Sequence, residues 1–144
     1  MQLSESEVRQ ICLTPLVLIY AVASAARSPE KINQLHIIRA VEHGLLSEDP
    51  FCAELFDFFR NNLHHFFREF ATRCDPADLE ALLAEVRATA ALLQQMASGA
   101  AFREAFVDFA RQLGEGSLLG KALAGAPVLQ ERAGQVVGIL QTGQ

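Results

Sequence analysis

The stretch Leu13–Ala26 limits the possible folds more than any other part of the chain. It reads LTPLVLIYAVASAA, contains no charged residue and has apolar residues on every side of a helix. A helix of this kind is surrounded by other helices or by lipid. Crossing the hydrocarbon layer takes about 20 apolar residues, and this run is shorter, is interrupted by Pro15 and is flanked by Arg9 and Arg27. The stretch therefore predicts the central helix of an all-helical domain, with no membrane insertion.

The length and charge of the chain narrow the classes of protein further. With 144 residues, 51% of them hydrophobic, residues 1–144 are expected to form one domain with a substantial core. The net charge is −5 and the basic residues are scattered, which argues against a nucleic-acid partner. Lysine occurs only at Lys31 and Lys121, so the chain has no polybasic membrane patch. The N-terminus lacks the basic start and small-residue cleavage site of a signal peptide.

Three cysteines, Cys12, Cys52 and Cys74, lie far apart among apolar neighbours. No pair has the spacing of metal ligands, and this pattern is typical of reduced core cysteines in the cytoplasm. A redox role would need a cation that stabilises a thiolate, and Arg73 beside Cys74 is the candidate for that alternative.

Helix-start signals divide the chain into about six helices. Ser4 with Glu7 forms a capping box that opens a first segment through Cys12. Pro15 removes a backbone donor, so we expect the helix to restart or kink there. Further boundaries are predicted at Ser28-Pro29-Glu30, at Gly44, at Ser47-Glu48-Asp49-Pro50, at Asp75-Pro76-Ala77-Asp78, at Ser98-Gly99 and at Gly125-Ala126-Pro127.

Apolar residues recur three and four positions apart between these boundaries, as on one face of an α-helix. The first of these apolar stripes predicts one long third helix, and three more stripes predict the helices after it. The connections between the helices are short, as in antiparallel helix bundles. The stripes comprise Cys52, Leu55, Phe56, Phe59, Leu63, Phe66, Phe67, Phe70 and Cys74; Leu79, Leu82, Leu83, Val86, Ala90, Leu93 and Met96; Phe102, Ala105, Phe106, Phe109 and Leu113; and Leu129, Ala133, Val136 and Leu140.

Two segments of the chain resemble the TerB-like domain of tellurite-resistance proteins and of some co-chaperone N-terminal regions. They are AVASAARSPEKINQL, at residues 21–35, and FREAFVDFARQLGEGSLLGKALAGAPVLQERAGQVVGIL, at residues 102–140. The resemblance implies an all-helical fold and a bacterial role in stress response or tellurite resistance. The family's Asp-Gly is replaced here by Ala26-Arg27, and only Glu30 keeps an acidic position of the motif. We therefore expect no metal at this position.

A candidate polar surface site consists of Glu30 together with His36, Arg39 and His43. Spacings of three and four place the last three on one side of a helix. A histidine pair can ligate zinc, but catalytic zinc takes three protein ligands, so a solvated polar face is the favoured interpretation.

The remaining motifs do not predict catalysis. His64 and His65 point about 100° apart on a helix and are expected on the surface. The stretch GEGSLLGK lacks the spacing of a P-loop and follows no strand, which makes it a helix–helix connection. No pair of nucleophile and base can be recognised, so no catalytic residue, cofactor or metal is assigned.

Phenylalanine is the abundant aromatic residue, with ten copies against one tyrosine and no tryptophan. Phe51, Phe58 and Val107 lie off the main stripes. They either pack on a second layer of helices, which we favour, or form a patch that faces a partner.

The sequence thus predicts a non-enzymatic helical binding module of the bacterial cytoplasm. Its expected partners are proteins, and a homodimer is compatible with this interpretation. The alternative is a small-molecule or lipid carrier with an apolar pocket between the phenylalanine-rich helices.

Overall fold

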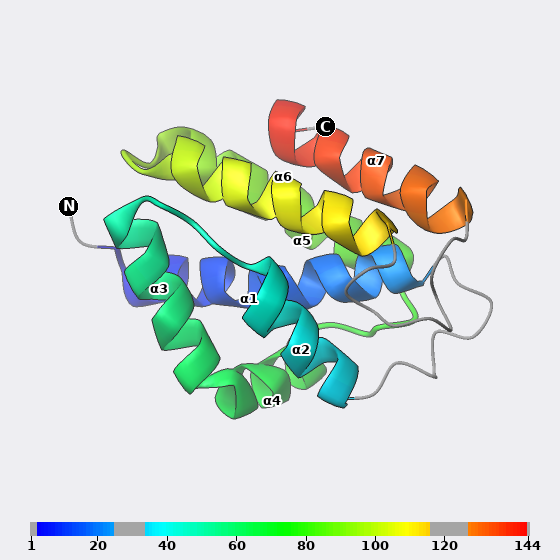
Figure 1. The fold of residues 1–144 in the computed structure, drawn as a ribbon, viewed down its shortest axis with the longest axis horizontal. Helices are drawn as coiled ribbons and strands as arrows, with labels where there is room; N and C mark the ends of the chain where they lie inside the picture. Colours follow the sequence, from blue (N-terminus) through cyan, green and yellow to red (C-terminus); the bar gives the residue numbers. More distant parts are fainter. Residues whose placement is uncertain (1–2, 25–33, 116–126, 144) are drawn as a thin grey trace.

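The described residues form an all-α helical bundle, as the sequence predicts. The computed structural model describes residues 3–24, 34–115 and 127–143, which contain seven helices and no strand. Figure 1 shows the helices arranged around α1. They are α1 (Glu5–Ala23), α2 (Gln34–Gly44), α3 (Pro50–Asn61), α4 (Leu63–Arg73), α5 (Leu79–Gln95), α6 (Gly99–Glu115) and α7 (Pro127–Thr142).

Helix α1 begins at the predicted capping box and runs without interruption through Pro15. The Ser4 hydroxyl accepts a hydrogen bond from the Glu7 backbone N–H, and the Glu7 carboxylate accepts one from the Ser4 N–H. The prediction of a restart at Pro15 was wrong, because one helix of 19 residues covers both expected segments. It ends at Ala23, and the predicted end at Ala26 and the helix start at Ser28-Pro29-Glu30 lie outside the described residues.

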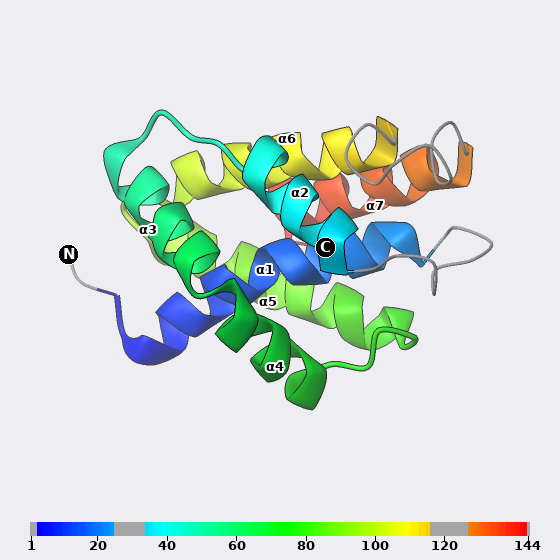
Figure 2. The same cartoon turned by 60° about the horizontal axis from the view of Figure 1, so that its bottom comes forward.

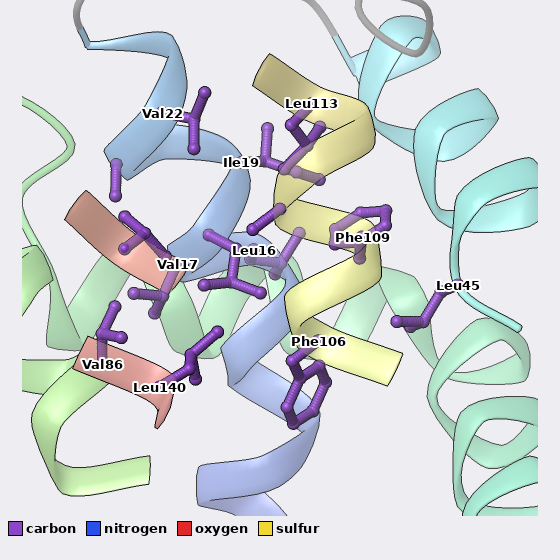
Figure 3. Packing of buried hydrophobic residues seen from close by; sticks show 14 of the residues in the cluster. Leu16, Val17, Ile19, Val22, Leu45, Val86, Phe106, Phe109, Leu113 and Leu140 are labelled. Carbon is purple, nitrogen blue, oxygen red and sulfur yellow. The ribbon is translucent and has the colours of Figure 1, made fainter. Parts of the chain in front are cut away.

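Helix α1 is the central helix of the bundle. Every residue from Gln10 to Ile19 is buried, and α1 lies against each of the other six described helices. In Figure 2 it passes between the α6–α7 pair and α5. Figure 3 shows Leu16 and Ile19 facing α6, while Val17 lies on the side of α5 and α7. An all-round apolar sequence is what such a position requires.

By length and composition alone, α1 is also the one described helix that could cross a membrane. The apolar run Leu13–Ala26 is too short to cross a membrane, but α1 also includes the residues before it from Glu5 onward, so the length of the helix does not exclude a membrane span. In the structure 67% of its apolar window is buried within the protein, and core helices pass the same test of length and composition.

The predicted third helix is in fact two helices, which is a second correction. Asn62 leaves the helical conformation at φ −123° and ψ 24°, and α4 then starts at Leu63. The asparagine amide donates to the Phe58 carbonyl at 2.9 Å, a side-chain bond that competes with continued helix. The apolar stripe continues across the break, with Phe59 and Phe66 buried on either side of it.

Helices α5, α6 and α7 bury their predicted stripes and begin where the sequence predicted. Asp78 caps α5 through the Ala81 N–H, and α6 begins at Gly99. Helices α6 and α7 approach closely at Gly114, where an added Cβ would lie 2.5 Å from the Cβ of Ala133. The stretch GEGSLLGK lies outside the described residues from Gly116 onward.

The phenylalanine rings fill the space between α3 and α6. The Phe56 ring lies 5.7 Å from the rings of both Phe102 and Phe106. Of the residues that lie off the stripes, Val107 is buried as predicted. The prediction that a second layer of helices covers Phe58 was wrong, because Phe58 is 46% exposed. Phe51 is 36% exposed and touches Phe102 with its edge.

Candidate functional site

The polar surface site predicted from the sequence is only partly described. Glu30 lies outside the described residues. On α2, Arg39 and His43 are exposed and His36 is half-buried. Among the residues that the structure describes, no three His, Cys, Asp or Glu side chains are placed to hold a metal ion. Arg39 and His43 thus lie on the exposed side of α2.

The second histidine pair also lies on the surface. His64 and His65 are both exposed, and His65 stands one helical turn before Glu69 at 3.7 Å. The break at Asn62 places both histidines on α4 rather than on the one long helix that the sequence predicted.

The three cysteines are buried free thiols, as predicted. Burial, and then the nearby charge of Glu69, raises the pKa of Cys12 to about 12. The pKa of Cys52 is raised to about 11, again chiefly by burial. Burial also raises the pKa of Cys74, and this outweighs the opposite effect of Arg73. None of the three has the lowered pKa of a reactive cysteine, so the redox alternative gains no support.

A buried polar cluster between α1 and α5 was not predicted. The Gln10 amide donates to Thr89 Oγ1 at 2.9 Å, and the Thr14 hydroxyl donates to the Gln10 carbonyl at 2.8 Å. Thr14 and Thr89 share a hydrogen bond of 2.8 Å, in which Thr89 is the donor because Thr14 has already used its proton. The three bonds close a ring, which fixes the register of α1 against α5.

The rim of this cluster carries charges that join α4 to α1 and α5. Arg73 donates to Gln10 Oε1 at 2.7 Å and pairs with Glu85 at 3.3 Å. Because the amide and hydroxyl groups all have partners inside the protein, the cluster has no group left for a ligand. The sequence signal for it was the pair of polar residues Gln10 and Thr14, one turn apart in an apolar helix.

A cleft of about 720 Å³ lies between α3, α6 and the segment that joins α2 to α3. Its walls combine carboxylates with small apolar side chains and one arginine. The lining residues are Leu46, Ser47, Glu48, Asp49, Ala53, Asp57, Arg60, Ala101, Glu104, Ala105 and Asp108. We call it the α3–α6 cleft.

Arg60 holds the segment before α3 in place and so shapes the α3–α6 cleft. Its guanidinium donates to the Leu45 carbonyl and, at 2.6 Å, to Asp57. Leu45 is buried, while the next residue, Leu46, is 67% exposed at the cleft. It is the most exposed of the large hydrophobic residues that the structure describes. No periodic pattern marked it, because it follows the last turn of α2.

The carboxylates of the cleft divide into engaged and free groups. Asp49 caps α3 through the Cys52 N–H, Asp57 pairs with Arg60, and Asp108 accepts from Gln112. Glu48, from the segment before α3, and Glu104, from α6, both line the cleft and are exposed. Neither has an ion pair or side-chain hydrogen bond within the described part of the chain.

Comparison with protein-family models, with curated proteins and with solved structures finds no match to this chain. The fold and the α3–α6 cleft are therefore the grounds on which a function can be proposed.

Proposed function

We propose that this protein is a non-enzymatic binding module that engages a protein partner through the α3–α6 cleft. The observation that carries the proposal is the position of Leu46, which is 67% exposed on the rim of a cleft of about 720 Å³. An exposed apolar side chain beside a concave, partly apolar surface is typical of a protein-interaction site.

A binding role also agrees with the way the described ionisable groups are used. Asp49 and Asp78 cap helices, and Arg73 with Glu85 fastens α4 and α5 to α1. Each of these groups serves the fold. Glu48 and Glu104, which form no ion pair or side-chain hydrogen bond within the described residues, lie on an exposed part of the cleft where a partner can reach them.

The resemblance to the TerB-like family extends this proposal to a biological setting. It supports a role for the module in a bacterial stress response, with tellurite resistance as the specific case. The proposed partner is then a cytoplasmic protein of that response.

The carrier alternative places a ligand between the phenylalanine-rich helices. In the structure that space is occupied by Phe56, Phe102 and Phe106, whose rings lie 5.7–6.2 Å from one another. The surface cleft is thus the better-supported binding region.

Site-specific crosslinking in cells tests the proposed function. A photoreactive phenylalanine analogue at position 46 is compared with the same analogue at position 35. Leu35 is a matched control because it is also an exposed leucine, at 53%, and does not line the cleft. We expect a distinct protein adduct from position 46 alone.

The captured protein, once purified, should bind the parent chain and the Leu35→Asp variant but lose affinity for Leu46→Asp. Adducts of equal yield from both positions would contradict the proposal. So would a partner that binds Leu46→Asp as well as it binds the parent.

A further inference from the structure

The charge of the α3–α6 cleft points to the kind of partner that fits it. Five of its lining residues are acidic and one is basic, which gives a formal charge of −4 from five negative charges and one positive charge. The positive charge of Arg60 is paired with Asp57 of the same cleft, and its guanidinium also donates to the Leu45 carbonyl. A bound partner would therefore face a surface with a net negative charge.

The free carboxylates are arranged to receive cations on two sides. Glu48 comes from the segment before α3 and Glu104 from the first half of α6, so they belong to separate elements of the fold. The alanines Ala53, Ala101 and Ala105 lie among the lining residues of the same cleft. Small side chains leave room for the long aliphatic stems of lysine or arginine, whose charged ends reach outward to carboxylates.

We propose that the occupant of the α3–α6 cleft is a protein segment with at least two lysine or arginine residues and one large apolar residue. The basic side chains extend over the alanines to Glu48 and Glu104, and the apolar residue packs on Leu46. This inference rests on the proposed function, since it assigns a chemistry to the partner at the same site. A small polyamine offers the same charges but has no side chain to cover Leu46.

A smaller hollow of about 380 Å³ adjoins the α3–α6 cleft along α6 and shares Glu104 and Asp108 with it. Its lining also includes Arg103 and Arg111, so the charged side chains of this hollow carry no net formal charge. The net negative charge belongs to the α3–α6 cleft, which favours binding of a basic segment there rather than in the smaller hollow.

An unbiased peptide selection tests the inference. A phage-displayed library of random dodecapeptides is panned against the full chain, and the enriched peptides are synthesised with a fluorescent label for anisotropy titrations. We expect enrichment of lysine or arginine together with leucine, isoleucine or phenylalanine. Affinity should fall as salt rises, because the attraction is partly electrostatic.

Two pairs of variants then locate the binding. Glu48→Gln combined with Glu104→Gln should weaken the enriched peptides about tenfold, which corresponds to about 1.4 kcal/mol. Glu54→Gln with Glu131→Gln removes the same charge from exposed positions that do not line the cleft, and should change affinity less than about twofold. Leu46→Ala should weaken the peptides while leaving spermidine binding unchanged.

Three results of the peptide selection and the variant titrations would overturn the inference, and a fourth comes from a competition experiment. The three are enrichment of neutral or acidic peptides, no enrichment at all, and an equal loss of affinity in the two double Glu→Gln variants. Spermidine that competes with the peptides at similar affinity would also contradict it, because the apolar contact would then contribute nothing. If crosslinking at position 46 still captures a partner without a basic segment, the proposed function stands and this inference fails.

Discussion

Helices α6 and α7 approach so closely at Gly114 that a larger residue there should destabilise the protein. In Gly114→Ala the new Cβ would lie 2.5 Å from the Cβ of Ala133 and 3.3 Å from the Leu129 carbonyl oxygen. Both neighbours are fixed to the backbone of α7, so no rotamer change relieves the overlap and the helices must separate.

The size of the effect follows from two opposing contributions. Overpacking of this kind costs about 1–3 kcal/mol. Replacing glycine by alanine in a helix interior contributes up to about 1 kcal/mol in the opposite direction, but Gly114 is the residue before the last of α6, where the gain is small. We expect Gly114→Ala to lower the free energy of unfolding by about 1–2 kcal/mol.

The α7 glycines supply matched controls of opposite sign. An added Cβ at Gly134 or Gly138 meets no atom within 4 Å. Gly134→Ala and Gly138→Ala should each raise the free energy of unfolding by about 0.5–1 kcal/mol, through helix propensity alone. Urea denaturation followed by circular dichroism measures all three variants.

A double variant identifies the overlap itself. Ala133→Gly removes the side chain that Gly114→Ala would strike, so the combined variant should lose less stability than the sum of the two single losses. An additive double variant would refute the reasoning, as would a Gly114→Ala chain that is as stable as Gly134→Ala.

Three further predictions follow from the core. In urea denaturation, Phe59→Ala should lower the free energy of unfolding by about 3–5 kcal/mol. Phe58→Ala, at a position that is 46% exposed, should lower it by less than about 1 kcal/mol. Equal losses in the two variants would mean that the buried stripe is misassigned. Thr89→Val opens the hydrogen-bonded ring and should cost about 1–3 kcal/mol, and a variant as stable as the parent would show that the ring contributes nothing. The pKa of Cys12 is raised to about 12 in the folded chain, so the contribution of this thiol to folding stability is complete below about pH 9, where the unfolded thiol titrates, and declines as the pH rises toward 12. In parallel denaturation series, Cys12→Ala should therefore lose less stability than the parent between pH 9 and 11. Identical dependence of stability on pH in the two chains would contradict this.

The sequence predicted those parts of the fold that depend on local patterns. The capping box at Ser4, the start of α5 after Asp78 and the break at Ser98-Gly99 each rest on a few neighbouring residues, and each was confirmed. The buried stripes were confirmed for the same reason, because three- and four-residue spacing places apolar residues on one face whatever the partner is.

The two wrong predictions about helix boundaries concern positions where local rules conflict. Pro15 removes a backbone donor but lies in a helix whose side chains are buried on all sides, and the packing around α1 maintains the helix. At Asn62, no neighbouring proline or glycine indicates in the sequence that the helix ends. The asparagine side chain bonds to the Phe58 carbonyl, and the chain turns there although the apolar spacing continues.

The α3–α6 cleft could not be predicted because it depends on contacts between distant segments. Its walls come from α3, from α6 and from the residues before α3, and Arg60 reaches the Leu45 carbonyl across 15 positions of sequence. The ring of Gln10, Thr14 and Thr89 likewise joins residues 75–79 positions apart. Composition identified the charges and the polar groups but not which of them meet.

The central position of α1 is tested most directly by native-state hydrogen exchange in buffer without detergent. The account predicts that the amides of residues 16–22 exchange only when the whole chain unfolds, since their side chains are buried among the other helices, apart from the partly buried Tyr20. The amides of α2, which lies against α1 and α6 at the edge of the bundle, should exchange sooner. Exchange of residues 16–22 that is as fast as that of residues 36–42 would contradict the account.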